Sequence, residues 1–207
     1  MVFLHRLFFF SLLLVSINAN GQSSFTVKYY AMTIHPFGDA TAHLQPRKLD
    51  PNAVFVLNSG LFVGYEKFVY QDLVSVKFIQ GALSDCSKGL ALVSHLGVRG
   101  TLYQTPLHRL SVGLGPTYIV RESWKRFGNQ YESSGFFNEA NWDRWGLVQW
   151  KFIAYGVDVE YDYCIRKRDN LSISITPGLP LANIISIGWK HWIGKTYTRP
   201  LAPYVPK

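Results

Sequence analysis

The chain has 207 residues, of which only 16% are charged, whereas 48% are hydrophobic and 15% are aromatic. This composition excludes a disordered or low-complexity chain, and it falls short of the roughly one quarter of charged residues that is usual in a soluble domain. The formal net charge is +8, and two cysteines are too few for a disulfide scaffold or a Cys-rich zinc site.

Residues 1–21 have the pattern of a secretory signal peptide. A positively charged start, 1–6, precedes the mainly apolar stretch 7–17, and Ala-Asn-Gly at 19–21 places small residues before an expected cleavage site at Gln22. The apolar stretch is shorter than the ~20 residues that a transmembrane helix needs. No second long apolar run follows it. The mature chain is therefore expected either to be secreted as a soluble protein or to cross an outer membrane with strands.

From residue 25 onward, apolar and polar positions alternate, with β-branched, aromatic and glycine residues throughout, which indicates β-strands. In one strand Leu92 and Val98 share a face opposite His95, and in another Ile153 is expected on the apolar face opposite Asp158. The alternation predicts strands over residues 25–34, 53–65, 69–82, 89–103, 108–122, 147–165, 170–178 and 183–193.

These strands have one apolar face and one face of small, polar and charged residues. A soluble barrel turns the apolar face inward, whereas a membrane barrel turns it outward. Glycine, serine and threonine on the charged face suit a narrow lumen, and aromatic residues near the strand ends suit a membrane interface. The long connections 35–52 and 123–146 alternate with the short connections 66–68, 104–107 and 166–169, as outer loops alternate with periplasmic turns.

We therefore predict an all-β protein, an eight-stranded antiparallel up-and-down transmembrane β-barrel, over residues 22–193. The segment 194–207 is expected to be a Pro-rich periplasmic tail. If the apolar face turned inward instead, the chain would be a secreted, lipocalin-like binder of an apolar ligand.

The charged residues on the inward face are expected to form an ion-pair network that plugs the lumen, because buried charges are costly unless they are paired. The network comprises Lys77, His95, Arg99, Arg121, Asp158, Glu160, Asp162 and Lys190, with Glu66 as a further acidic member. An alternative interpretation is a membrane-embedded enzyme, an acyl hydrolase or transferase acting on lipid A, in which His95 works with Asp158 or Glu160.

Other signs of catalysis are few. The sequence has neither a G-x-S-x-G nor an H-E-x-x-H motif. The remaining histidines lack metal-ligand spacing, so we expect no metal and no cofactor. These missing motifs favour a non-enzymatic protein.

The long connection after residue 123 is the main candidate for binding a partner. It mixes aromatic rings with charges of both signs, and it could either bind an extracellular glycan or protein or fold over the barrel mouth. Its candidate binding residues are Trp124, Phe136, Phe137, Trp142 and Trp145.

The two cysteines are expected to lie at opposite ends of the barrel. Cys86 falls in an outer loop, and Cys164 falls near the periplasmic end of its strand. A disulfide tolerates a Cα separation of at most about 7 Å, so we expect no bond between them.

The excess of basic residues needs an anionic partner. An exported protein meets no genome, which excludes nucleic acid. Outer-membrane lipid and lipopolysaccharide are the expected electrostatic partners.

The signal ending before Gln22 and the stretch SVGLGPTYIVRESW at 111–124 resemble small eight-stranded outer-membrane β-barrel proteins of Gram-negative bacteria, of a Bacteroidetes-like type. The resemblance spans nearly all of 25–193. It implies residence in the cell outer membrane and a structural, adhesive or partner-binding role through the outer loops. Some such barrels are lipid A deacylases, but their inward His followed closely by Ser-Asn is absent from LSISITPGLPLANIISIGWKHWI at 171–193.

Overall fold

The computed structural model describes residues 22–39, 42–84, 89–123, 143–177 and 183–194. Their regular elements are β1 (Ser23–Ile34), η1 (Ala42–Leu44), β2 (Phe55–Tyr70), β3 (Val74–Ser84), β4 (Leu90–Gln104), β5 (His108–Glu122), β6 (Asp143–Trp145), β7 (Val148–Arg166), β8 (Asp169–Pro177) and β9 (Asn183–Ile193). No helix among these residues is long and apolar enough to cross a membrane.

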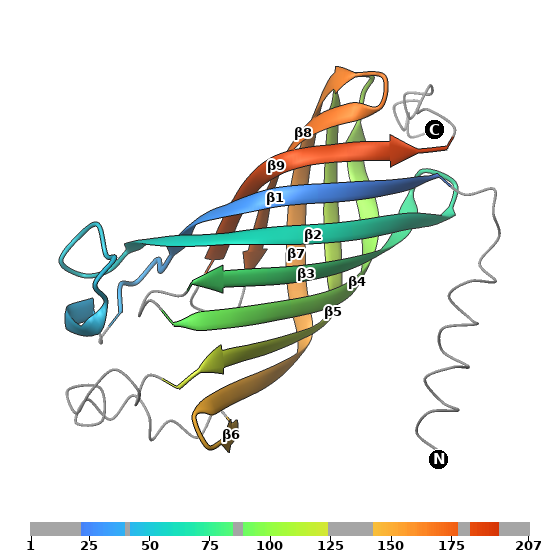
Figure 1. Ribbon diagram of the computed structural model, residues 1–207. Helices are drawn as coiled ribbons and strands as arrows, with labels where there is room; N and C mark the ends of the chain where they lie inside the picture. The colour runs from blue at the N-terminus through green and yellow to red at the C-terminus, as the bar shows by residue number, and fades with distance from the viewer. Residues whose placement is uncertain (1–21, 40–41, 85–88, 124–142, 178–182, 195–207) are drawn as a thin grey trace, which may run out of the picture.

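The strands form one closed antiparallel sheet. Its order is β5-β4-β3-β2-β1-β9-β8-β7-β6, and an additional pairing of β5 with β7 closes the ring. Figure 1 shows the strands winding around a common interior. Only β6, a three-residue strand that pairs with the start of β7, lies outside the ring. The predicted eight-stranded up-and-down barrel is therefore confirmed, and β6 is an addition to it.

The two ends of the barrel differ. The connections 71–73, 105–107 and 167–168 are short and lie at one end, which we call the turn end. Two long connections, between β1 and β2 and between β5 and β6, begin at the other end, which we call the loop end. This is the predicted alternation of short and long connections.

The apolar face of the strands points outward. On β4, Leu92 is 42% exposed and Val98 is 58% exposed, whereas His95 and Arg99 on the opposite face are buried. The same pattern holds around the ring, where exposed aliphatic and aromatic side chains cover the outer surface. This orientation is opposite to that of a lipocalin-like barrel, in which the apolar face would line the cavity.

The turn between β2 and β3 lies five residues later than the sequence analysis placed it. The predicted connection 66–68 is strand, because β2 continues to Tyr70 and the chain reverses at 71–73. Glu66 and Phe68 of this segment are buried inside the barrel. Gln71, with a φ of 46°, makes the reversal.

A β-bulge in β7 changes the face of one predicted outward residue. The pairing of β5 with β7 shifts between Gly115 and Thr117, so that Thr117 pairs with Ile153 and Tyr118 pairs with Phe152. Because Thr117 is an inward, buried residue, Ile153 also lies on the inward face, and its predicted outward position is wrong. A strict period of two misses the extra residues of a bulge.

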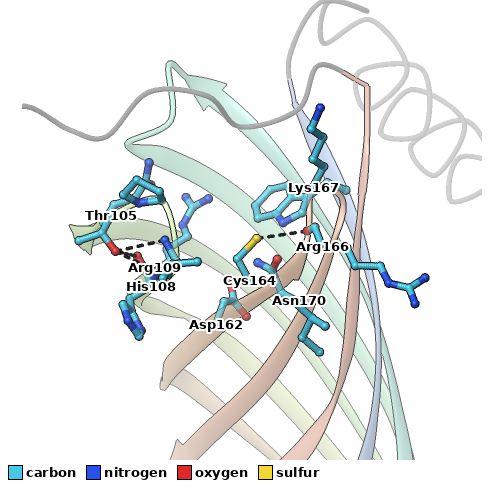
Figure 2. Close-up of a pocket in the computed structure, with 13 residues that line it drawn as sticks. Thr105, His108, Arg109, Asp162, Cys164, Arg166, Lys167 and Asn170 are labelled. Carbon is cyan, nitrogen blue, oxygen red and sulfur yellow. Dashed lines mark hydrogen bonds between the residues drawn. The ribbon is translucent and has the colours of Figure 1, made fainter.

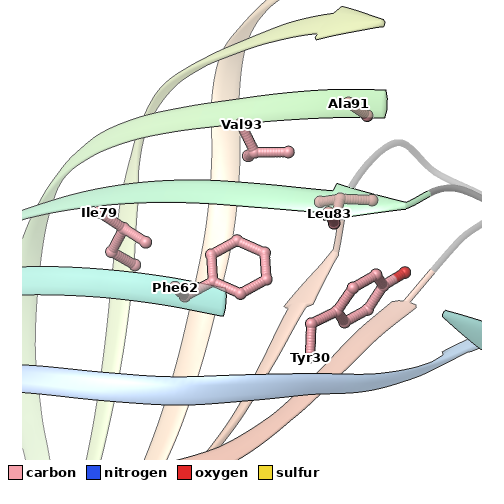
Figure 3. Packing of buried hydrophobic residues seen from close by; sticks show 6 residues of the cluster. All are labelled: Tyr30, Phe62, Ile79, Leu83, Ala91 and Val93. Atoms are coloured by element: carbon pink, nitrogen blue, oxygen red, sulfur yellow. The ribbon is translucent and has the colours of Figure 1, made fainter. Parts of the chain in front are cut away.

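Part of the lumen is apolar. Toward the loop end, side chains of β1 to β4 form a buried cluster of Tyr30, Phe62, Ile79, Leu83, Ala91 and Val93 (Figure 3). Tyr30 and Phe62 meet edge to face, with ring centroids 5.7 Å apart. The ring of Phe62 lies over Gly81, its cross-strand partner, where a Cβ would collide with it. The expectation of a purely small and polar lumen is therefore wrong at this end.

Candidate functional site

The centre of the barrel holds a cluster of buried charged side chains from six strands. Each lies at an inward position of its strand, between residues that face out. The cations are Lys28 of β1, Lys77 of β3, Arg99 of β4 and Lys190 of β9, and the anions are Glu66 of β2 and Asp158, Glu160 and Asp162 of β7. All eight are at most 4% exposed.

Glu160 is the hub of this cluster. Its Oε2 lies 2.5 Å from the Nζ of Lys28 and 2.5 Å from the Nζ of Lys77. Its Oε1 lies 3.0 Å from the Nη1 of Arg99 and 2.8 Å from the Nζ of Lys190. One carboxylate thus joins four cations from four different strands, so it ties opposite parts of the wall together.

The other carboxylates share the same cations. Glu66 accepts from Arg99 at 3.1 Å and lies 2.7 Å from the Nζ of Lys190. The Nζ of Lys190 also lies 2.9 Å from Asp162, and the Nε of Arg99 lies 3.3 Å from Asp158. Four positive and four negative groups balance in formal charge. Their mutual pairing offsets the cost of removing them from water.

The structure brings together six of the eight predicted network members, Lys77, Arg99, Asp158, Glu160, Asp162 and Lys190. It adds Lys28, which sequence reasoning missed. The available signal was its place in β1, where Lys28 alternates with outward Val27 and Tyr29 and is therefore an inward residue.

Two predicted members have hydrogen-bond partners outside the cluster. His95 is buried, and its Nδ1 lies 2.8 Å from the Oγ1 of Thr117. Arg121 is cross-strand from Ala91, nearer the loop end, and donates from Nε to Gln149 at 3.1 Å. The described residues include no hydrogen bond from His95 to Asp158 or Glu160, the partners that the enzyme interpretation assigns to it.

Little free space remains beside the cluster. A cavity of about 20 Å³ adjoins Lys28, Lys77 and Phe62. Such a volume accommodates a single water molecule. The polar cluster and the apolar cluster thus fill the central lumen.

A larger cavity of about 330 Å³ opens at the turn end (Figure 2). Arg109 on its wall has its guanidinium carbon 4.4 Å from the centre of the Phe68 ring and 5.2 Å from that of Trp192. Its Nη2 donates to the Oγ1 of Thr101 at 2.5 Å. This cavity was not predicted, because its residues come from two short turns and from adjoining strand ends that are distant in the sequence.

Cys164 also lines the turn-end cavity. It is a free cysteine whose Sγ donates to the carbonyl oxygen of Arg166 at 3.1 Å. Cys86 lies outside the described residues.

The described part of the predicted binding loop is short. Trp145 lies in β6 and is 85% exposed. Trp124, Phe136, Phe137 and Trp142 lie outside the described residues. Within the described ranges, no group of three or more histidine, cysteine or acidic residues could hold a metal ion.

Among the solved structures that are similar to this chain are two of one protein and one of another. The crystal structure of Ail, the attachment invasion locus protein of Yersinia pestis, is 11% identical with a TM-score of 0.46, and the match covers 84% of this chain and 99% of that chain. The structure of Ail in complex with the heparin analogue sucrose octasulfate is also 11% identical, with a TM-score of 0.47, and the match covers 84% of this chain and 99% of that chain. The crystal structure of the outer membrane protein OprG from Pseudomonas aeruginosa is 9% identical with a TM-score of 0.49, and the match covers 85% of this chain and 97% of that chain.

No protein-family model matches the chain, and no curated protein matches it. Identities this low carry no information about shared ligands or activities.

Proposed function

We propose that this protein is an outer-membrane β-barrel with a closed lumen that works through its outer loops, as a structural, adhesive or partner-binding protein. In this proposal residues 1–21 are the export signal, residues 22–193 form the barrel, and residues 194–207 are a periplasmic tail. The turn end then faces the periplasm and the loop end faces the outside.

The observation that carries the proposal is that charged side chains lie inside the barrel and apolar side chains lie outside, the reverse of the arrangement in a soluble protein. Buried lysine, arginine and carboxylate groups fill the interior around Glu160, while leucine, valine and tyrosine side chains cover the outside. Exposed apolar surface of this extent suits lipid and not water. A filled lumen conducts no solute, so binding falls to the ends of the barrel.

At the loop end, Trp145 offers a large exposed ring on β6, a strand of the sheet that lies outside the ring of eight. Tryptophan is enriched at binding surfaces because it buries a large rigid area and keeps one hydrogen-bond donor. The positive net charge favours an anionic extracellular glycan or an acidic protein surface as the partner.

The test uses cells that display the full-length protein and an array of anionic and neutral glycans. Deletion of residues 126–140, and separately the Trp145→Ala variant, should reduce retention on at least one anionic glycan. The matched control is Leu107→Ala, which removes an exposed apolar side chain at the turn end. Equal retention by all variants would contradict a glycan-binding role for these loops.

A further inference from the structure

A groove of about 590 Å³ lies on the outside of the barrel at the loop end. One side consists of outward residues near the end of β1 and the start of β2, among them Tyr29 and Leu57. The other side is the segment 46–49 of the long connection between these strands. Tyr29, Leu57 and Leu49 are all about half exposed, so the floor and rim are apolar and accessible.

The segment 46–49 is held firmly beside β2. β3 ends at Ser84, opposite Ser59, and β2 continues beyond it toward Phe55. There Leu57 donates its backbone N–H to Arg47 at 3.0 Å, and Leu49 donates to Phe55 at 2.8 Å. The segment therefore takes the place of β3 along the first residues of β2.

Two cations stand at this groove. Arg47 is half-buried and donates from Nη1 to the hydroxyl of Ser84 at 3.0 Å. Lys48 adjoins it along the chain. Among the described residues neither side chain is within ion-pair distance of a carboxylate, although the charge of Lys48 acts on the nearby Asp50. The nearby carboxylate of Asp50 accepts three backbone N–H groups of its own loop, from Asn52, Val54 and Phe55.

The groove also offers neutral hydrogen-bonding groups. Tyr29 donates its hydroxyl to Ser59 at 3.2 Å, and both residues line the groove. Paired cations, hydroxyl groups and an adjoining apolar wall match a ligand that combines phosphate, sugar hydroxyls and acyl chains. A soluble anion would leave the apolar wall unused, and an uncharged lipid would leave the cations unused.

We propose that this groove binds the phosphorylated headgroup of an outer-leaflet glycolipid, with phosphate on Arg47 and Lys48 and the first acyl carbons along Leu57 and Tyr29. The inference rests on the proposed membrane placement, which sets the loop end at the level of the outer-leaflet headgroups. Lipid bound there would brace the β1–β2 connection at the membrane surface.

The test is native mass spectrometry of the full-length protein released from detergent, with diphosphoryl lipid A as the probe. The variant R47Q/K48Q removes both charges. The matched control R166Q/K167Q removes the same two residue types from exposed positions at the end of β7 and in the turn that follows it, at the opposite end of the barrel. Each protein is first checked for the mobility shift between unboiled and boiled samples, so loss of the barrel is distinguished from loss of the site.

We expect affinity for diphosphoryl lipid A to fall about five-fold for each charge removed in R47Q/K48Q, and to stay unchanged in R166Q/K167Q. Dephosphorylated lipid A should bind weakly to all three proteins. Equal binding by the wild type and R47Q/K48Q would overturn the site. If the affinity for phosphatidylglycerol fell in R47Q/K48Q by the same factor as the affinity for diphosphoryl lipid A, the assignment to a glycolipid would be overturned.

Discussion

Arg99 and Glu160 are 61 residues apart in the sequence, yet the Nη1 of Arg99 donates to the Oε1 of Glu160 at 3.0 Å. The two residues do not lie on neighbouring strands, because β5 runs between β4 and β7. The contact crosses β5 at Gly113, which pairs with Arg99 on one side and with Asp158 on the other. A Cβ at Gly113 would lie 2.5 Å from the Cγ of Arg99. The absence of a side chain at Gly113 lets the arginine stem lie across the strand.

The Gly113→Ala variant should therefore lose stability. The added methyl group displaces the stem of Arg99 and weakens its contacts with Glu160 and Asp158, at a cost of about 1–3 kcal/mol. Urea unfolding in lipid vesicles measures this change. The control is Gly100→Ala on β4, where an added Cβ meets nothing within 4 Å. Equal losses in both variants would contradict the crossing contact.

The Glu160→Gln variant tests the hub of the ion cluster. It leaves four buried cations with three carboxylates, and removal of one partner from a buried ion pair costs about 3–5 kcal/mol. We expect a lower unfolding midpoint in the same vesicle assay. Asp72→Asn, which removes a carboxylate from the turn between β2 and β3, should have little effect. If Glu160→Gln had the same unfolding midpoint as Asp72→Asn, the cluster would contribute no stability.

The pH dependence of the β1–β2 connection should be governed by Asp50. Backbone hydrogen bonds, the strongest from Phe55 at 2.8 Å, hold the pKa of the Asp50 carboxyl below its usual 3.8. Because the folded pKa is the lower one, the stabilisation is present above pH 3.8 and is lost as the pH falls through the folded pKa. The amide proton shifts of Val54 and Phe55, followed by NMR in micelles, should titrate in that acidic range.

Asp50→Asn provides the control for this titration. The amide shifts of Val54 and Phe55 should then be flat below pH 3.8. Persistence of the titration in this variant would assign it to another group.

The sequence was sufficient for the strand count, the barrel class and the outward apolar face, because a period of two is a local property of each strand. It also placed Asp158, Glu160 and Asp162 on one inward face of a single strand. It misplaced Ile153, since a bulge interrupts the period. It also missed Lys28, whose ion-pair partner Glu160 is on the distant strand β7. The turn-end cavity depends on contacts between distant strand ends, which no local pattern records.

The two cysteines should both remain thiols. Cys164 pairs with Asn170 next to the β7–β8 turn, whereas Cys86 follows β3, which ends at the loop end. Alkylation of the unfolded, unreduced protein should therefore add two labels, one for each cysteine. Recovery of protein with no label would mean a disulfide and would contradict this topology.

The most direct test of the central claim is the electrophoretic mobility of the full-length protein extracted from outer membranes in detergent, with and without boiling. A closed, ion-paired barrel with an apolar exterior should resist the detergent when cold, so the unboiled band should migrate differently from the boiled band. Recovery of the protein in the soluble periplasmic or culture fraction, with no mobility shift, would contradict the account.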